Sequence, residues 1–257
     1  MCIRDRCIGI VSAAYGQRDS WASAQPTNDK DINVIDVQEM KYPPIAEYAP
    51  LQSEGVEVIR AKLDDEGRVV QAEALSGDDL LVPDCLANLK RWRFQPNVTK
   101  TAIVVYHLKK LPGECKSLSS LFSLKRPNLI TVAGCLPFKI EHGLEFVRPQ
   151  QAEMISNSEI EVTHFDDQMK YPPLARSARI EGVVVVKVRL DDKGSVQDAA
   201  AISGAPLLIS SCLKNAKNWK FQPNSGKAAV IVYNFVIVND DPGQILFEPP
   251  NFVTVTG

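Results

Sequence analysis

The paired carboxylates are the residues that most obviously suggest catalysis. Asp64-Asp65 and Asp191-Asp192 each place two acids side by side, and neighbouring carboxylates whose pKa values differ can act as a general acid and a general base. Each pair, however, comes two residues before a glycine, in the polar composition of a solvated turn. Because a turn offers no apolar cleft that would raise a carboxyl pKa, we expect these acids to be turn residues.

The sequence contains no other pattern of a reactive site. The cysteines include no C-x-x-C pair, and His107, His142 and His164 are too widely separated to give a zinc-ligand spacing. The sequence also lacks a G-x-S-x-G motif, a glycine-rich phosphate loop and an H-E-x-x-H motif. We therefore expect no enzyme activity, no catalytic residues, no cofactor and no metal.

Length and composition indicate a globular protein. A chain of 257 residues can form one large domain or two small ones. Its 45% hydrophobic and 23% charged residues are typical of a folded protein, and the formal net charge of -2 leaves no basic excess to neutralise phosphates. Nucleic acid is therefore not an expected partner. No apolar stretch reaches the roughly 18 residues that suggest a membrane span.

The first residues predict an exported chain whose natural start has been lost. The opening letters MCIRDR resemble a translated sequencing adapter, and we expect them to be a scar. Residues 7–15 are apolar and are followed by small-residue contexts, such as Ala22-Ser23-Ala24, that suit signal cleavage. We expect residues 1–30 to be a disordered signal-peptide remnant, and the alternative is a frayed, mildly apolar tail. Anchoring in the inner membrane stays open if the front is missing.

An internal repeat organises the rest of the chain. The motif MKYPP at residues 40–44 recurs at 169–173, and residues 54–106 align without a gap to 181–233 with 28 identities in 53 positions. This identity predicts two copies of one small domain. The expected divisions are repeat 1 at 31–110, a linker at 111–158, repeat 2 at 159–240 and a tail at 241–257.

Each copy has the residue pattern of a small α+β domain. In residues 183–190, valines and Leu190 on one face alternate with a face that includes Lys187 and Arg189, which is the period of a half-buried strand. Apolar residues spaced three to four apart after Pro206 predict a helix that packs on the sheet. For copy two we expect a helix at 174–179, strands at 183–190 and 195–202, a helix from 206 and a strand at 228–238. This order, αββαβ, fits a three-stranded antiparallel sheet with two helices on one face.

Two basic pairs lie on the outer face of the expected sheets. They are Arg60 and Lys62 in copy one and Lys187 and Arg189 in copy two. Exposed cations of this kind usually contact solvent, and we expect that here. Binding of an acidic partner is the alternative.

Both copies carry one set of motif residues, to which we assign structural roles. Tyrosine and proline precede the first helix, glycine leads into the first strand, and tryptophan, phenylalanine and proline precede the last strand. The residues are Tyr42, Pro43, Gly55, Trp92, Phe94 and Pro96 in copy one, and Tyr171, Pro172, Gly182, Trp219, Phe221 and Pro223 in copy two. Over residues 40–109 and 168–238 these motifs resemble the C-terminal domain of TonB, the bacterial energy transducer.

The resemblance implies a periplasmic protein-binding domain. In that family the domain adds a short extended peptide of an outer-membrane TonB-dependent receptor to the edge of its sheet, and the full transducer couples to a proton-driven complex of the inner membrane. The tandem arrangement and the missing proline-rich spacer depart from that transducer. A role in energy transduction and transport across the outer membrane is therefore one expectation. The alternatives are a structural or assembly protein whose repeated domains pair with each other or dimerise, and a detached sensor domain.

The last strand of copy two is the expected partner-binding site. Strand addition needs a strand whose backbone groups are unpaired at a sheet edge. We assign partner binding to Val230, Val232, Tyr233, Asn234 and Val236. The apolar outer face of this strand also needs a cover, which could be the sister domain, a homodimer mate or a receptor peptide.

Copy one is the weaker candidate for strand addition. Its last strand, at residues 102–108, is expected to be shorter and to end in Lys109-Lys110. Lysines at a strand end commonly prevent edge-to-edge pairing. We therefore prefer copy two as the binding domain.

The cysteines divide into two groups. Cys85 and Cys212 occupy the same inward position of the long helix and are expected to be small buried hydrophobic residues. Cys115 and Cys135 lie between the repeats and could form a disulfide in an oxidising compartment. Pairing with the helix cysteines remains open, because four cysteines allow three connectivities.

Overall fold

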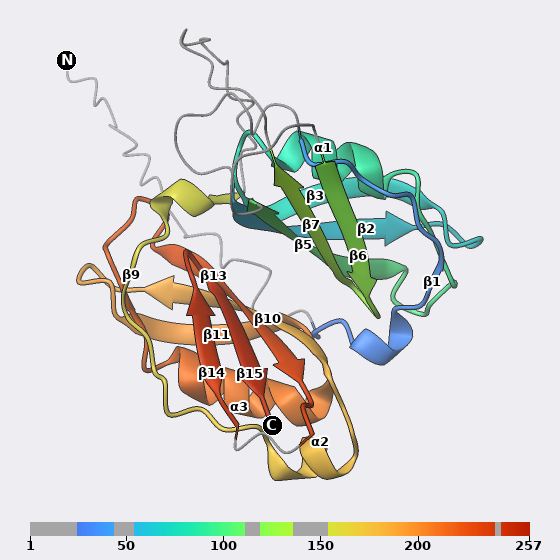
Figure 1. Cartoon of the computed structure of the whole chain (residues 1–257). Coiled ribbons are helices and arrows are strands. Elements are labelled where there is room, and N and C mark those ends of the chain that lie inside the picture. The colour runs from blue at the N-terminus through green and yellow to red at the C-terminus, as the bar shows by residue number, and fades with distance from the viewer. Residues whose placement is uncertain (1–24, 44–53, 111–118, 136–153, 240–242) are drawn as a thin grey trace, which may run out of the picture.

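The protein consists of two sheets packed face to face, each covered on its outer side by a helix (Figure 1). The computed structural model describes residues 25–43, 54–110, 119–135, 154–239 and 243–257. The fold is mixed α+β, as expected. The order of layers is helix, sheet, sheet, helix, because each sheet packs one face on its own helix and the other face on the sister sheet.

The first half of the chain builds one sheet around an antiparallel hairpin and a crossing helix. Its main elements are β2 (Gly55–Leu63), β3 (Val69–Gly77), α1 (Val82–Leu89) and β5 (Thr101–Lys110). The short strands β1 (Val34–Asp36) and β4 (Arg93–Phe94) pair beside this sheet. At the β2–β3 turn Asp64 accepts hydrogen bonds from the N–H groups of Glu66 and Arg68, so this acid is a turn residue.

The second half has the same arrangement. Its main elements are α2 (Pro173–Ser177), β10 (Gly182–Leu190), β11 (Val196–Ser203), α3 (Pro206–Ala216) and β13 (Ala228–Val236), with β9 (Val162–His164) paired to β12 (Lys220–Phe221). Leu190 and the even-numbered valines of β10 face the helix, while Val183 and Val185 face the other sheet. Both faces agree with the alternation in the sequence.

Each sheet has more strands than the three that the sequence predicts. The additional strands form two hairpins, β6 (Ser119–Lys125) with β7 (Leu129–Cys135) and β14 (Ile245–Glu248) with β15 (Phe252–Thr256). One strand of each hairpin lies parallel to the last strand of a repeat, so β7 pairs with β5 and β15 pairs with β13. The expected linker and tail therefore contribute integral strands, and the prediction of a three-stranded sheet is wrong.

The same turn holds both added hairpins in place. The side-chain amide of Asn128 donates to the carbonyl of Ile103 at 3.0 Å, and that of Asn251 donates to the carbonyl of Val230 at 2.9 Å. The backbone carbonyl of Asn128 also accepts the N–H of Val105, and that of Asn251 accepts the N–H of Val232. The two repeats are thus longer than the aligned region that first identified them.

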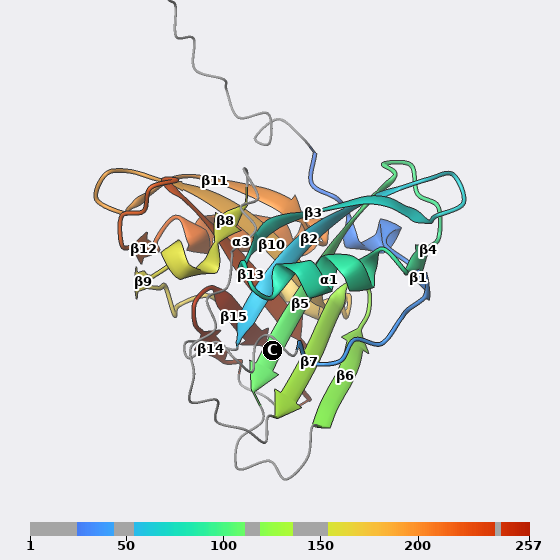
Figure 2. The same cartoon turned by 90° about the horizontal axis from the view of Figure 1, so that it is seen from above.

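The segments that lead into the repeats cross over to the other half. β8 (Ile155–Ser156), which precedes repeat 2, pairs in parallel with the end of β3 in repeat 1 (Figure 2). Reciprocally, Thr27, which precedes repeat 1, forms a parallel bridge with Ser203 at the end of β11. Each half therefore completes the outer edge of the other half's hairpin.

Candidate partner-binding site

β13, the strand assigned to partner binding, lies inside its sheet. The strand order β11-β10-β13-β15-β14 gives β13 a neighbour on each side. Asn234, for example, is opposite Val183 of β10 and Thr254 of β15. The expectation of an exposed edge is wrong because residues 252–256 fill that position.

The assigned residues are also covered on both faces. Tyr233 packs in the core beside α3, whereas Val230 and Val232 pack against the sister sheet. Asn234 is buried and Val236 is half-buried. Their role in binding a partner stays a prediction, and it requires β15 to leave the sheet.

The sister domain covers the apolar face of β13 that points away from α3. Its contribution to the shared core comes from Val56, Val58, Ile103, Val105 and Leu129. This cover is one of the three that the sequence left open. It removes from water an apolar patch that would otherwise destabilise a thin sheet or attract another protein.

Reciprocal ion pairs connect each added hairpin to the opposite domain. Lys109 Nζ lies 2.5 Å from Glu248 Oε2 of β14, and Lys125 Nζ of β6 lies 3.8 Å from Glu181 Oε1. Lys109 and Lys110 are themselves paired with β7, so they do not terminate an exposed edge. The sequence does not indicate this role, because it depends on strands outside the aligned repeat.

His107 is a buried aromatic residue at the same contact. Its ring centroid lies 4.2 Å from that of Phe252. Burial lowers its pKa from 6.5 to about 3, with a further contribution from the nearby Lys109 charge. The imidazole is therefore neutral near pH 7, and its 3.8 Å approach to Glu248 is not an ion pair.

β14 forms the outer edge of the second sheet within the described residues. The N–H of Thr256 donates to the carbonyl of Gln244, so these two residues form a hydrogen-bonded pair of the hairpin. Because hydrogen-bonded and non-hydrogen-bonded pairs alternate along antiparallel strands, the backbone groups of Ile245 and Phe247 point away from β15. The Leu246 side chain is 59% exposed, so this edge combines outward-pointing backbone groups with an accessible apolar side chain.

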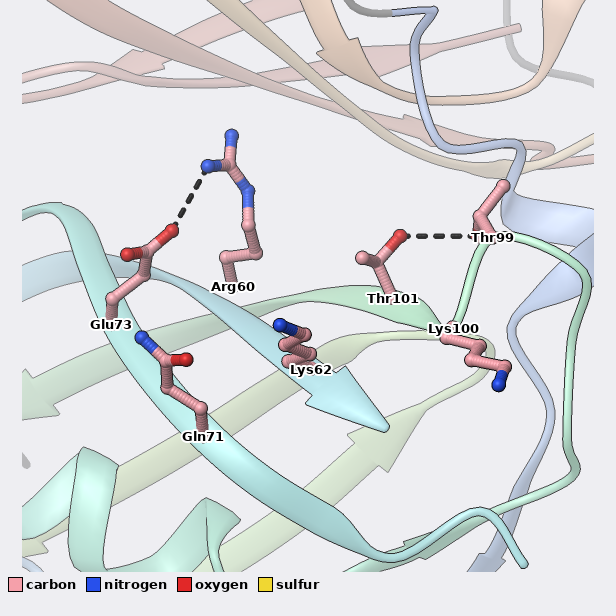
Figure 3. A pocket seen from close by; sticks show the side chains of 7 residues that line it. All are labelled: Arg60, Lys62, Gln71, Glu73, Thr99, Lys100 and Thr101. Atoms are coloured by element: carbon pink, nitrogen blue, oxygen red, sulfur yellow. Dashed lines mark hydrogen bonds and ion pairs between the residues drawn. The ribbon is translucent and has the colours of Figure 1, made fainter. Parts of the chain in front are cut away.

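A shallow basic pocket of about 270 Å³ lies on the face of the first sheet that is turned away from α1, beyond Val58 on β2 (Figure 3). Arg60 forms an ion pair with Glu73 at 2.9 Å, and Lys100, at the rim, pairs with Asp65 at 2.6 Å. The remaining lining residues are Lys62, Gln71, Thr99 and Thr101. These groups offer positive charge but no nucleophile beside a base, and the described parts of the chain contain no cluster of metal ligands.

Two matching hydrogen-bond networks lie beneath the helices. Asn215 Oδ1 accepts from Trp219 Nε1 and from Tyr233 Oη, both at 2.9 Å. Asn88 does the same for Trp92 and Tyr106 in the first half. Both tryptophans are thus buried core residues. The signal in the sequence is an identical asparagine four residues before each tryptophan.

The described thiols are inert. Burial raises the pKa values of Cys85 and Cys212 well above the usual range, so both are protonated in the core. Cys115 lies outside the described residues, and Cys135 is described only as the last residue of β7. The predicted disulfide between them stays a prediction.

Glu57 is a fully buried acid that sequence analysis did not single out. Its counterpart in the second half is Val184. Burial raises its pKa well above 4.5, against the effect of the Asp78 N–H, which donates to Glu57 Oε2 at 2.7 Å. The nearby charges of Asp78 and Asp79 raise it further.

We expect Glu57→Gln to reduce the pH dependence of stability. The stability that neutral Glu57 contributes is fully present below pH 4.5 and is lost as the pH rises, because the acid ionises at lower pH in the unfolded chain than in the folded one. Glutamine keeps an acceptor for the Asp78 N–H and carries no charge. Urea denaturation between pH 5 and 8 should therefore show a flatter profile for Glu57→Gln than for the wild type. Glu73→Gln, at an exposed ion pair, should retain the wild-type profile.

Residues 167–237 match the family model described as Gram-negative bacterial TonB protein C-terminal. The match covers repeat 2 and ends before β14, whereas the assignment of repeat 1 depends on the internal identity. No curated protein and no solved structure matches the chain significantly. Residues 167–237 are therefore similar to the TonB C-terminal domain, a periplasmic family whose members act as non-enzymatic protein-interaction modules.

No helix in the described ranges is both long enough and apolar enough to cross a bilayer.

Proposed function

We propose that the protein is a periplasmic protein-interaction module that adds an extended segment of a partner to a sheet edge. The observation that carries this proposal is the match of residues 167–237 to the TonB C-terminal family. An outer-membrane TonB-dependent receptor is the proposed partner, and transport across the outer membrane is the proposed process. Coupling to a proton-driven complex of the inner membrane would require an anchor in addition to the residues described.

We place the accepting edge at β14. β13 is paired on both sides, so a partner strand could reach it only by displacing the buried β15. At β14 the outward backbone groups of Ile245 and Phe247 can pair with a partner without breaking a ladder. Phe247 is fixed by ring contacts with Phe165 at 5.0 Å and Trp219 at 5.6 Å, which hold this edge on the core.

A photo-crosslinking amino acid at Leu246 tests this placement. In periplasmically expressed protein, position 246 should crosslink to an outer-membrane receptor, and Ile245→Pro should reduce the yield at least several-fold by removing an outward N–H. The control carries the same crosslinker at the fully exposed Val98 in repeat 1, where no receptor adduct is expected. Equal yields at the two positions would contradict an interface at β14.

A structural or assembly role is the second candidate function. The specific support for it is the apolar core between the two sheets, to which residues of both halves contribute. In this case, the repeats serve to build a stable two-domain unit without energy transduction. No receptor adduct should then form at Leu246, and receptor-dependent uptake should be unchanged in cells that lack the protein.

A further inference from the structure

A short strap, residues 25–31, crosses the junction between the two domains. At one end Thr27 is held on the second domain, because its N–H donates to the carbonyl of Ile202 and its carbonyl accepts the N–H of Gly204, both at 3.0 Å. At the other end the strap leads into Ile32, which is buried in the first core. The strap therefore connects the edge of β11 to the body of the other domain.

Asp29 lies in the middle of the strap and is buried, with an exposed fraction of 5%. Its carboxyl group faces the start of β10, where a Cβ atom added to Gly182 would lie 3.1 Å from Asp29 Oδ2. Neither carboxyl oxygen has a hydrogen bond of good geometry within the described residues. A carboxylate in such a position lacks the partners that a buried charge requires.

The polar groups around Asp29 suit a neutral acid. The Val183 N–H and the Asn128 side chain face it, and Asn128 Oδ1 is itself buried without a partner. A protonated carboxyl can donate to such an oxygen, whereas a carboxylate can only accept. The sister repeat has a neutral residue here, Asn157, whose side-chain amide donates to the carbonyl of Val56 at 3.1 Å.

Among the described residues, no neighbouring cation neutralises Asp29. On the strap, Lys30 and Asp31 are exposed. On the elements packed against it, Glu181 pairs with Lys125 at 3.8 Å, and Arg126 donates to the carbonyl of Val34 at 2.9 Å. Burial raises the pKa of Asp29 from 3.8 to about 8, against the weaker effects of Val183 and Asn128, and none of these charges contributes.

We propose that the strap is a proton-dependent latch, in which neutral Asp29 holds the strap across the domain junction and loss of its proton releases Thr27 from the edge of β11. The released edge exposes the carbonyl of Ile202 and the N–H of Gly204, which the strap otherwise pairs. The proposal does not depend on the proposed function, because it concerns only the contact between the strap and the two domains.

The direction of the pH effect follows from proton linkage. The acid has a higher pKa in the docked strap than in the released strap, where its ordinary value is 3.8. Docking is therefore strongest below pH 3.8, weakens as the pH rises, and becomes independent of pH above about 8. Between these limits the docking equilibrium constant falls about tenfold per pH unit.

Amide hydrogen exchange of the whole chain tests the latch. The protection factors of the Thr27 and Gly204 amides, corrected for intrinsic exchange, should fall about tenfold per unit between pH 6 and 8. Asp29→Asn, which copies the sister residue Asn157, should make them independent of pH. Asp31→Asn, which removes an exposed charge from the same strap, should retain the wild-type profile.

Three results would overturn the proposal. One is a flat wild-type profile, and another is an Asp31→Asn profile as flat as that of Asp29→Asn. The third is a parallel loss of protection at the Val186 amide in the middle of β10, since that amide reports global unfolding. If Asp29→Asn does not fold, the pH dependence of the Gly204 and Val186 protection factors in the wild-type protein still tests the proposal.

Discussion

Deletion of residues 243–257 is expected to unfold the second domain. The deletion removes Phe252, Val253 and Val255, which are at most 2% exposed. A fully buried apolar side chain of this size contributes about 1.5 to 3 kcal/mol, so the three together contribute roughly 5 to 9 kcal/mol. This is comparable with the total stability of about 5 to 15 kcal/mol of a typical domain. Circular dichroism and urea denaturation of the truncated chain should show loss of the cooperative transition.

Point variants separate the loss of packing from the loss of chain length. Val253→Asp should reproduce the effect of the deletion, because it places a charge in the core of the second domain. Leu246→Asp, on the exposed side of the same hairpin, should leave the free energy of unfolding within about 0.5 kcal/mol of the wild type. A truncated chain that keeps its stability and gains affinity for an extended peptide would contradict the prediction. It would also make β13 the accepting strand and β15 its removable cover.

Replacement of Asn215 by alanine is expected to lower the free energy of unfolding by about 2 to 5 kcal/mol. The change leaves Trp219 Nε1 and Tyr233 Oη without their shared acceptor, and an unsatisfied buried donor costs about 1 to 3 kcal/mol. It also removes the side-chain hydrogen bond from Asn215 to the carbonyl of Asp166. Urea denaturation followed by tryptophan fluorescence measures the loss.

Asn218→Ala is the matched control for this variant. Asn218 follows the same helix and its side chain donates to Asp166 Oδ2, but it is exposed. Its replacement should therefore change the stability by no more than about 0.5 kcal/mol. Similar losses of stability for the two variants would contradict the prediction that burial of Asn215 and its two donors causes the larger effect.

The sequence predicted the features that depend on local periodicity. In β10 the alternation of side chains correctly separated Val184, which faces the helix, from Val185, which faces the sister sheet. Turns behaved similarly: Gly67, at the β2–β3 turn, has a φ of 78°. In both cases neighbouring residues along the chain determine the structure.

The sequence did not predict the features that depend on distant segments. The added hairpins have arms of only four to seven residues, and their pairing with β5 and β13 is parallel, so no short turn indicates it. Their similarity is concentrated around the asparagine turns, and Asn128 lies 25 residues after Ile103 whereas Asn251 lies 21 residues after Val230. Polar residues such as Asn215 were not predicted, because the apolar pattern of a helix indicates only its apolar core residues. Asp29 is buried in the domain junction, so its sequence neighbours do not indicate its environment.

The exchange of leading segments affects the order in which the protein can be completed during synthesis. When repeat 1 leaves the ribosome, the outer edge of β3 is unpaired, because its partner β8 begins at Ile155. The apolar face around Val58 and Val105 also lacks its cover until repeat 2 has been made. The first repeat is thus made first, but it can reach its native packing only after the second repeat has been translated.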